Sequence, residues 1–445
     1  MSAIARYFIS RGIVVAGYDR TQTELTEQLC KEGALVHYED NVELIPVQCR
    51  NKENTLVVYT PAIPSDHCEL TFFREQCFVI QKRAQVLGTL TRTLKGLCVA
   101  GTHGKTTTSS MAAHLLHQSH VDCNAFLGGI TKNYRTNYIL SSSSPYVVIE
   151  ADEFDRSFHW LTPFASVITA TDADHLDIYG DKEQVLESFR QFVDKTMSDG
   201  VVIYNKDLPL VTDRKCLTYG FEDADVMARD IRIEDGMTKF SVVTKEGLEF
   251  GEYKMQLFGK HNVMNALSAI MTCFQLQVDM KTVREGLAAF QGVQRRFDIR
   301  FKNERACYID DYAHHPNEIS AAISSTRERY PDFRYTAIFQ PHLYTRTRDF
   351  APEFAEALSK VDRLVLLDIY PARELPIPGV TSEIIFDAVT APVKVLMRKE
   401  ELLDWMKEQT LEGKELFMTL GAGDIDRLVG PLAEMLTEKH RKGNA

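Results

Sequence analysis

Short apolar runs alternate with helix-like segments along almost the whole 445-residue chain, and this alternation constrains the fold more than any other feature. Strands that are apolar on both faces are typical of parallel sheets covered by helices on both sides. We therefore predict an α/β fold built from doubly wound sheets. The runs expected to form strands are 55–60, 97–100, 146–151, 166–171, 201–204, 335–339, 363–370, 393–397 and 416–420.

Length and two local changes in the sequence suggest three domains. A chain of 445 residues is too long for one ordinary core. The basic stretch "TRTLKG" (91–96) marks the first expected boundary, and "GVQRRFD" (292–298) marks the second. We expect domains at residues 1–92, 93–295 and 296–445.

Composition narrows the class of protein. The hydrophobic share is 44%, the charged share is 25% and the formal net charge is -11. These values are typical of a soluble globular protein, and the acidic balance argues against nonspecific binding to nucleic acid. Nine scattered cysteines without a C-x-x-C pair indicate reduced thiols, and the apolar run 13–16 is too short to span a membrane. We expect a cytoplasmic protein without a membrane or nucleic-acid partner.

The stretch "VAGTHGKTTTSS" (99–110) lies between an expected strand and an expected helix. A strand, a glycine-bearing turn and a helix form the context of a phosphate loop, in which backbone N–H groups hold phosphate oxygens. Lys105 would then reach the β- and γ-phosphates, and Thr106 would offer its hydroxyl to Mg²⁺. The usual spacing is G-x-x-x-x-G-K-[ST], and here only Thr and His separate the two glycines. A chance turn with a solvated lysine is the alternative.

Two further expected strands end in groups that could bind a metal. Glu150 ends the run 146–151, at the edge where α/β proteins bind ligands, and a carboxylate there could hold Mg²⁺. The stretch "TATDADHLDIYG" follows the next strand and offers Asp174 and His175. Three further carboxylates follow Glu150, and a solvated acidic loop explains them as well as a metal site does. They are Asp152, Glu153 and Asp155.

Two pairs of polar residues follow in the second half of the chain. Asn262 and Asn265 are three residues apart, which places them on one face of a helix, although an asparagine at a helix start is often only a cap. Arg295 and Arg296 are adjacent in "GVQRRFD", where a surface pair is the alternative.

Two loops that follow strands in the C-terminal part combine histidines with charged residues. In "YIDDYAHHPNEI" (308–319), Asp310, Asp311, His314 and His315 are compatible with a metal site or with a ligand-binding loop before a helix that begins at Pro316. The stretch "FQPHLYTRTRDF" (339–350) predicts a clamp for a carboxylate or phosphate. The residues that would form this clamp are His342, Arg346 and Arg348.

As an ordered set these motifs resemble the Mur ligases of peptidoglycan synthesis. That family has a shortened phosphate loop, matched here by 101–107, and then the motifs E-A-D-E, A-D-H, H-N-x-x-N, R-R-F-D and D-D-Y-x-H-H-P. All of them occur in this chain in the same order, and the resemblance extends over nearly its whole length. It implies three domains, of which the first and last are Rossmann-like and the central one is a P-loop ATPase-type parallel sheet.

The resemblance also implies the roles of individual residues. It assigns ATP binding to Gly101, Thr102, His103, Gly104, Lys105, Thr106, Thr107, Asn262, Asn265, Arg296 and Asp311. It assigns Mg²⁺ to Thr106, Glu150 and His175. It assigns the amino-acid and substrate end to Tyr312, His314, His342 and Arg346. The residues expected to act in catalysis are Lys105, Glu150, His175, Arg296, Asp311, His342 and Arg346.

Within the family, "FQPHLYTRTRD" favours the activity that adds L-alanine to UDP-N-acetylmuramate. The expected reaction uses ATP to convert the lactyl carboxylate into an acyl phosphate, which the amine of L-alanine then attacks. Two alternatives stay open. One is a sibling ligase that attaches a recycled peptide to the same sugar nucleotide, and the other is a nucleotide-binding protein that has lost catalysis.

The start of the chain departs from the family pattern. Mur ligases open with a strand and a glycine-rich turn beneath the uridine diphosphate, followed by a helix that resembles "MSAIARYFISRG" (1–12). The pattern thus predicts that the coding sequence before Met1 encodes that strand and turn. It also predicts that the 445-residue chain binds ATP but binds the sugar nucleotide weakly.

Overall fold

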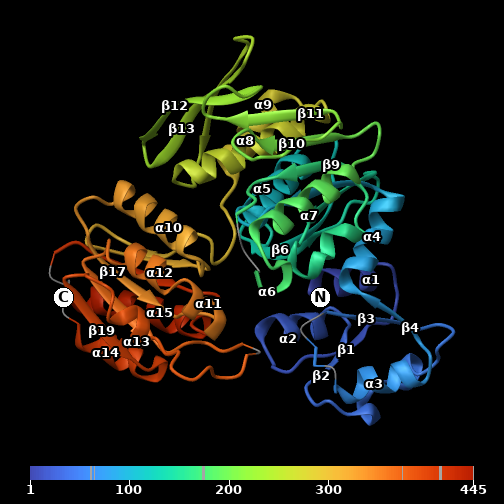
Figure 1. Cartoon of the computed structure of the whole chain (residues 1–445), viewed down its shortest axis with the longest axis horizontal. Coiled ribbons are helices and arrows are strands. Elements are labelled where there is room, and N and C mark those ends of the chain that lie inside the picture. Colours follow the sequence, from blue (N-terminus) through green and yellow to red (C-terminus); the bar gives the residue numbers. More distant parts are fainter. Residues whose placement is uncertain (61–62, 65, 173–175, 373, 410–412, 444–445) are drawn as a thin grey trace. The chain divides into compact units, whose positions relative to one another are not determined.

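The computed structural model describes residues 1–60, 63–64, 66–172, 176–372, 374–409 and 413–443 (Figure 1). The chain forms two compact units, which interleave along the sequence. Unit 1 comprises Met1–Gln256 and Asn262–Gln291, and unit 2 comprises Leu257–His261 and Gly292–Ala445. The short segment Leu257–His261 therefore belongs to unit 2 although unit 1 flanks it on both sides.

A ten-stranded sheet forms the centre of unit 1, in the order β14-β13-β12-β11-β10-β9-β5-β8-β6-β7. Its middle strands are parallel, and β5 is buried along almost its whole length between β8 and β9. The carboxyl ends of these strands, where α/β proteins bind ligands, meet at one edge. The strands are β5 (Lys95–Ala100), β6 (Asn124–Thr131), β7 (Thr136–Ile139), β8 (Tyr146–Glu150), β9 (Pro163–Ile168), β10 (Val201–Asn205), β11 (Cys216–Gly220), β12 (Val226–Glu234), β13 (Met237–Thr244) and β14 (Glu249–Met255).

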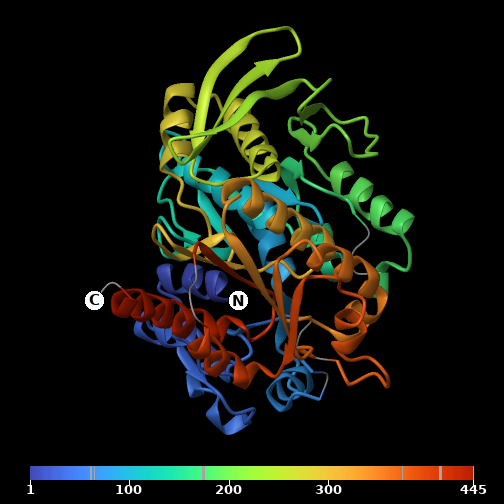
Figure 2. The same cartoon turned by 90° about the vertical axis from the view of Figure 1, so that its left-hand side faces the viewer.

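Helices cover both faces of this sheet, because the middle strands are apolar on both sides. Figure 2 shows α8 and α9 on one side of the sheet and α7 on the other. The helix α5 is buried from Thr106 to Leu116 and lies with α8 and α9, while α4 and α7 share a core cluster with β5 and β8. These elements are α4 (Arg83–Thr93), α5 (Lys105–His117), η3 (Phe154–Trp160), α6 (Leu176–Tyr179), α7 (Lys182–Asp194), α8 (Lys260–Gln275) and α9 (Met280–Ala289).

The first part of the chain contributes two separate pairs of parallel strands, β1 with β2 and β3 with β4. The helix predicted from "MSAIARYFISRG" is present as α1, whose Ala3 and Ile4 pack in the same core cluster as α4 and β6. The elements are α1 (Ser2–Ser10), β1 (Ala16–Tyr18), α2 (Glu24–Lys31), β2 (Leu35–His37), η1 (Val42–Leu44), η2 (Val47–Cys49), β3 (Leu56–Tyr59), α3 (Cys68–Glu75) and β4 (Val79–Lys82).

Unit 2 contains a six-stranded sheet in the order β15-β16-β20-β17-β18-β19. All of its neighbouring strands are parallel except β15 and β16, which pair antiparallel at one edge. The strands are β15 (Asp298–Lys302), β16 (Ala306–Asp311), β17 (Arg334–Phe339), β18 (Arg363–Leu367), β19 (Val393–Met397) and β20 (Glu415–Leu420).

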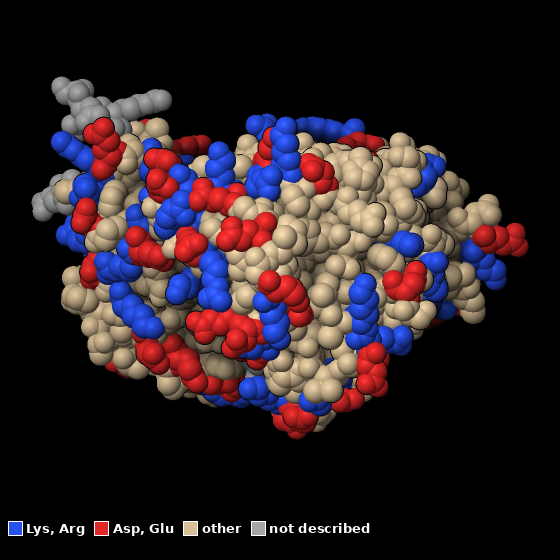
Figure 3. Space-filling view, turned by 90° about the horizontal axis from the view of Figure 1, so that it is seen from above, with Lys and Arg blue, Asp and Glu red and all other residues tan. Residues whose placement is uncertain are grey.

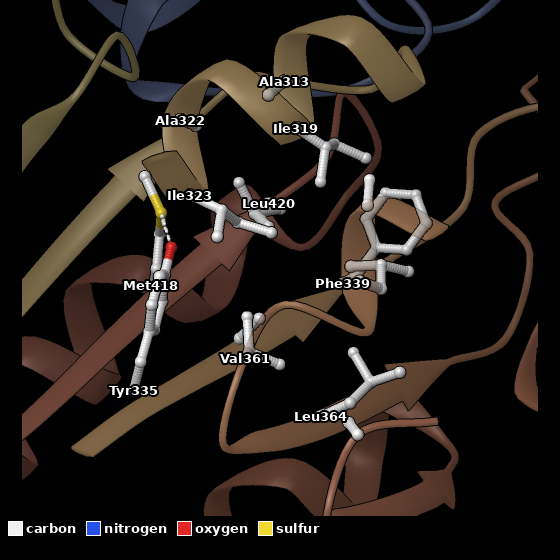
Figure 4. Close-up of a cluster of buried hydrophobic side chains, with 14 of the residues drawn as sticks. Ala313, Ile319, Ala322, Ile323, Tyr335, Phe339, Val361, Leu364, Met418 and Leu420 are labelled. Carbon is white, nitrogen blue, oxygen red and sulfur yellow. Dashed lines mark hydrogen bonds between the residues drawn. The ribbon is translucent and has the colours of Figure 1, made fainter. Parts of the chain in front are cut away.

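Two core clusters on opposite faces make the sheet of unit 2 doubly wound. One face packs against α10, α12 and α13, and the other packs against α14 and α15. Figure 4 shows the first cluster, in which the Tyr335 hydroxyl donates a hydrogen bond to Sδ of Met418 at 2.6 Å. The helices of this unit are α10 (Pro316–Arg329), α11 (Tyr344–Asp349), α12 (Ala351–Leu358), α13 (Glu383–Phe386), η4 (Lys399–Glu401), α14 (Leu402–Glu408) and α15 (Asp426–Gly443).

The predicted α/β class is confirmed, and every run predicted to form a strand contains one. The edges differ from the predicted parallel arrangement, since β12, β13 and β14 form an antiparallel extension and β7 pairs antiparallel with β6. On the face in Figure 3, Lys and Arg are interspersed with Asp and Glu. Within the described residues, no helix combines the length and apolarity that crossing a membrane requires.

Candidate active site

The predicted phosphate loop joins the carboxyl end of β5 to the start of α5. Gly101 has φ +142° and Gly104 has φ +81°, conformations that residues with a Cβ rarely adopt. A Cβ on Gly104 would also lie 2.6 Å from Oδ1 of Asn265. The two glycines therefore let the loop turn tightly, and the first N–H groups of α5 are left without partners inside the helix, as a phosphate site requires.

Lys105, the first residue of α5, extends back along this loop. Its Nζ lies 2.6 Å from the carbonyl oxygen of Gly101 and 2.8 Å from Oε1 of Glu153. Burial disfavours the ammonium, but the carboxylates of Glu153 and Asp152 outweigh burial, so the pKa of Lys105 is raised. Burial also raises the pKa of Glu153 to about 7. Glu153, which the sequence did not separate from a solvated acidic loop, is buried and holds the lysine.

Thr106 and Glu150, two of the three residues predicted to hold Mg²⁺, are in direct contact. The Thr106 hydroxyl donates to Oε1 of Glu150 at 2.9 Å, and the backbone N–H of Gly128 donates to the other carboxylate oxygen at 2.8 Å. A Cβ on Gly128 would lie 2.3 Å from both oxygens of Glu150. Hydroxyl and carboxylate oxygens are ligands that Mg²⁺ prefers, so these two side chains fit that ion.

Gly128 is a site residue that the sequence did not reveal. It lies inside β6, where a glycine is unfavourable unless another group must approach the backbone closely. The pair Gly128 and Gly129 within a strand was the available signal.

The two asparagines lie on one face of α8, as predicted. Nδ2 of Asn265 donates to Oδ1 of Asn262 at 3.2 Å, and the hydroxyl of Thr108 on α5 donates to Oδ1 of Asn265 at 3.1 Å. Both asparagines are buried. They thus lie against the start of α5 and the phosphate loop.

The rest of the loop is held by the segment after β9. Thr102 donates its backbone N–H to the carbonyl of Ala170 at 3.0 Å and accepts at its hydroxyl from the backbone N–H of Asp172, also at 3.0 Å. The hydroxyl of Thr169 donates to the carbonyl of His103. Thr107 is buried in the first turn of α5. The other predicted residues after β9, Asp174 and His175, lie outside the described residues.

A small cavity of about 90 Å³ opens in unit 1 next to Glu150. Charged groups from two other parts of unit 1 line it, namely Lys82 and Arg83 where β4 meets α4, and Asp152 after β8. Lys82 is paired there with Asp155 at 2.6 Å. The cavity therefore combines cationic side chains with the carboxylate that fits a metal.

In unit 2, the two arginines of "GVQRRFD" flank one aromatic ring. The guanidinium carbons of Arg295 and Arg296 lie 5.1 and 4.9 Å from the ring centroid of Tyr312. Arg295 also donates to Asp310 at 3.3 Å and to the carbonyl of Gly421 at 2.6 Å, so it serves the structure of this loop. Arg296 also makes a long ionic contact, 4.0 Å, with Glu318.

The carboxylate of Asp311, at the end of β16, accepts two backbone N–H groups. They are those of Phe297 at 2.7 Å and Ala313 at 2.8 Å. Burial raises the pKa of Asp311 to about 6, against the effect of Arg296 and these two hydrogen bonds. The neighbouring Asp310 instead accepts from Arg295 and from Thr419.

The side chains of "YIDDYAHHPNEI" that could bind a metal do not form one group in the structure. Asp310 and Asp311 have separate partners, and His315 caps α10 by accepting from the N–H of Asn317 at 3.4 Å. Within the described ranges, no three His, Cys, Asp or Glu side chains are grouped so that they could hold a metal ion. Of the two alternatives for this stretch, the geometry favours a ligand-binding loop.

Aromatic rings extend from this loop to the stretch "FQPHLYTRTRDF". The ring of His314 lies 5.2 Å from that of Tyr312 and 5.8 Å from that of His342, which stacks on Tyr370 at 5.8 Å. Tyr370 was not predicted as a site residue.

The two arginines of the predicted clamp differ in burial. Arg346 on α11 is 7% exposed, whereas Arg348 is exposed and paired with Asp349 at 2.7 Å. The structure therefore brings together Tyr312, His314 and His342, with buried Arg346 on the helix that follows His342, and leaves Arg348 at the surface.

Models of three domains match this chain in succession. The Mur ligase family catalytic domain matches residues 1–94, the Mur ligase middle domain matches 99–273, and the Mur ligase glutamate ligase domain matches 295–423. The chain belongs to the Mur ligase family. Its phosphate loop, Glu150 and the paired asparagines lie within the middle-domain match, and the aromatic series and Arg346 lie within the last match.

Named relatives of this Mur ligase cover nearly its whole length. The UDP-N-acetylmuramate–L-alanine ligase of Phocaeicola vulgatus is 52% identical over 99% of this chain and 96% of its own. The enzyme of the same name from Parabacteroides distasonis is 53% identical over the same shares of the two chains.

Solved Mur ligase structures agree with this fold. The UDP-N-acetylmuramate–alanine ligase of Thermotoga maritima matches with a TM-score of 0.84 and 28% identity over 98% of this chain and 96% of its own. A murein peptide ligase of Psychrobacter arcticus matches with a TM-score of 0.70 at 21% identity over the same shares, which supports the fold alone.

Proposed function

We propose that this Mur ligase joins L-alanine to the lactyl carboxylate of UDP-N-acetylmuramate with hydrolysis of ATP to ADP and phosphate. The observation that carries the proposal is the partly buried Lys105 of the phosphate loop, held beside the oxygen pair of Thr106 and Glu150. We infer the two substrates, UDP-N-acetylmuramate and L-alanine, from the names of the relatives at 52% and 53% identity.

The first step brings together two anions, the lactyl carboxylate and the γ-phosphate. Lys105 stays charged because its pKa is raised, so it neutralises phosphate charge without a change of protonation. Thr106 and Glu150, together with His175 outside the described residues, would hold Mg²⁺. Bound Mg²⁺ supplies further charge neutralisation on the phosphates.

The phosphate loop and α8 would bind the nucleotide. The first N–H groups of α5, which have no partner inside the helix, would bind phosphate oxygens, and Asn262 and Asn265 line the loop from the α8 side. We assign Arg296 and Asp311 of unit 2 to ATP as well. Asp311 is oriented for such a role by two backbone hydrogen bonds.

We assign the lactyl carboxylate of the sugar nucleotide to the cavity next to Glu150. Lys82 and Arg83 offer positive charge to an anionic substrate. A carboxylate in this cavity would lie close to the metal ligand Glu150. We assign the uridine diphosphate to the domain of residues 1–92, ATP to 93–295 and the amino acid to 296–445.

Arg346 is the proposed partner of the L-alanine carboxylate. A buried guanidinium can form charge-assisted hydrogen bonds that water weakens little. Tyr312, His314 and His342 would line the same end of the substrate. The amine then attacks the acyl carbon of the acyl phosphate, the amide bond forms, and inorganic phosphate leaves.

Two properties indicate where the enzyme acts in the cell. The reaction consumes ATP, and the nine cysteines are free thiols, five of them partly or fully exposed. We therefore infer a cytoplasmic enzyme.

Phosphate release measured with purified protein tests the proposal. We expect release only when ATP, Mg²⁺, UDP-N-acetylmuramate and L-alanine are all present. Release with the tripeptide L-alanyl-γ-D-glutamyl-meso-diaminopimelate in place of L-alanine would identify a peptide-attaching sibling. Binding of ATP without release under any combination would identify a protein that has lost catalysis.

A further inference from the structure

A glutamate from a distant loop binds the start of the helix that carries Arg346. One oxygen of Glu374 accepts the backbone N–H of Thr345 at 3.0 Å, and the other accepts the Thr345 hydroxyl at 2.5 Å. Thr345 is the second residue of α11 and directly precedes Arg346. Glu374 lies in the loop that leaves β18, so this contact joins two segments that both follow strands of the same sheet.

A second attachment joins the same two segments near His342. The N–H of Tyr370 donates to the carbonyl of Pro341 at 2.8 Å, and the N–H of Leu343 donates to the carbonyl of Tyr370 at 3.0 Å. The rings of His342 and Tyr370 stack with an angle of 25° between their planes. The stretch from His342 to Arg346 is thus attached at both ends to the segment 370–374.

Between these attachments the backbone is strained. Leu343 has φ +70° and ψ +137°, a region that a bulky residue rarely occupies. Such a conformation persists only when neighbouring contacts impose it. The backbone bonds to Tyr370 lie on one side of Leu343. On the other side, its carbonyl accepts the N–H of Thr347 at 3.1 Å and the Thr347 hydroxyl at 2.8 Å.

The helix α11 depends on this outside carboxylate, because its own N-cap residue, Leu343, has no side-chain hydrogen-bonding group. Glu374 supplies the missing acceptor, and its negative charge suits the start of a helix. The next residue, Leu375, is 85% exposed, so the loop at Glu374 contributes little to the core. Loss of the carboxylate should therefore affect the orientation of α11 more than the stability of the fold.

We propose that Glu374 is a positioning residue for the amino acid: by binding Thr345 it fixes α11 and orients Arg346 toward the carboxylate of the incoming amino acid. The inference rests on the proposed function, in which Arg346 binds that carboxylate. Glu374 itself touches no reactant, and it acts through Thr345.

Steady-state kinetics of the full-length enzyme tests this role. Glu374→Ala should raise the KM for L-alanine about 10-fold, the size of one lost charge-assisted hydrogen bond, and leave the KM for ATP within about twofold. Glu374→Gln keeps one acceptor oxygen and should lie between the wild type and the alanine variant. Glu383→Gln, at an exposed glutamate that begins α13, is the matched control and should match the wild type.

Thr345 supplies an independent measurement if Glu374→Ala folds poorly. Thr345→Val removes the hydroxyl donor and should raise the KM for L-alanine about threefold, whereas Thr345→Ser keeps the donor and should stay within about twofold of the wild type. Because the two residues act through one contact, the double variant Glu374→Ala/Thr345→Val should be no worse than Glu374→Ala alone.

Each outcome decides a different point. A wild-type enzyme without phosphate release dependent on L-alanine would overturn the proposed function and this inference with it. An active wild type with an unchanged L-alanine KM in both Glu374→Ala and Thr345→Val would overturn the positioning role alone. Equal rises in the KM values for ATP and L-alanine would also overturn it, because they would indicate a general structural role.

Discussion

Lys105 of the predicted phosphate loop forms an ion pair at 2.8 Å with Glu153, which follows β8, and the two side chains are 16% and 2% exposed. The pair holds the ammonium along the loop, where it also binds the carbonyl of Gly101. A lysine that is ordered in this way loses little side-chain entropy when a phosphate arrives. The contact therefore favours binding of the phosphate that we propose for this loop.

Lys105→Ala should lower turnover about 10²- to 10³-fold, as expected when one preorganised donor to developing charge is lost. The protein should stay folded, because Glu153, whose pKa is already raised to about 7, can take up a proton instead of remaining as a buried charge. Phosphate release and thermal unfolding are the measurements. Lys281→Ala, at an exposed lysine on α9, is the control. A variant that keeps more than about a tenth of wild-type turnover would exclude this loop as the phosphate site.

Gly128→Ala should raise the Mg²⁺ concentration needed for half-maximal activity about 10-fold or more, the usual cost of disturbing a residue that orients a metal ligand. The reason is steric, since the new Cβ would lie 2.3 Å from both oxygens of Glu150 and displace them from Thr106. Activity is measured as a function of Mg²⁺ concentration. Gly430→Ala is the control and should leave this dependence unchanged, because no described atom outside its own stretch of α15 lies within 4 Å of the added Cβ. The same Mg²⁺ dependence in Gly128→Ala and the wild type would remove Glu150 from the metal site.

Arg346→Ala should raise the KM for L-alanine about 10- to 150-fold with a smaller effect on ATP, because a hydrogen bond between charged groups contributes roughly 1.5–3 kcal/mol. Arg348→Ala changes an exposed arginine on the same helix and should have little effect. KM values for both substrates are compared among the three proteins. If the L-alanine KM of Arg346→Ala equals that of the wild type, Arg346 binds phosphate or serves the structure.

Stability should depend on pH through His159, which hydrogen-bonds to Ser188 at 2.8 Å. Burial, with added repulsion from Lys195 and Arg156, lowers the pKa of His159 to about 4 from an ordinary value of 6.5. Below pH 6.5 the unfolded chain binds a proton at this residue that the folded chain resists until about pH 4. The contribution of His159 is thus fully present above pH 6.5 and lost as the pH falls toward 4.

His159→Gln should flatten this part of the pH dependence. Between pH 6.5 and about 4, the free energy of unfolding should fall by about 2–3 kcal/mol more in the wild type than in the variant. This figure is smaller than the full pKa shift would give, because the ring is partly exposed to solvent. Denaturant unfolding of both proteins at a series of pH values measures the difference. Parallel curves would show that His159 does not titrate abnormally in the folded state.

The sequence predicted those features that depend on neighbouring residues. The phosphate loop is a continuous stretch in which an apolar strand, two glycines and a helix start follow one another, and each has a local signal. Glu150 could be placed because it ends a buried strand, and Asn262 and Asn265 because helical spacing puts them on one face.

Features that depend on distant residues were not predictable in this way. Gly128 contacts Glu150 because β6 and β8 are neighbouring strands. Glu374 contacts Thr345 because the loops after β17 and β18 begin at the same edge of the sheet. Asp310 and Asp311 are adjacent and chemically identical, yet one pairs with Arg295 and the other with backbone N–H groups. The antiparallel strand β13 was missed because its burial alternates, whereas the prediction rested on continuous apolar runs.

The short segment Leu257–His261 makes the C-terminal unit discontinuous in sequence. Phe258 is buried in the core of that unit, where Arg329 lies 4.4 Å from its ring, and a Cβ on Gly259 would lie 2.3 Å from the hydroxyl of Ser325. A recombination event that cut the gene at residue 292 would therefore separate part of this core from the rest. A functional exchange of this unit between relatives therefore has two possible forms. Either the segments 257–261 and 292–445 are transferred together, or the recipient already has a compatible phenylalanine and glycine in the first segment.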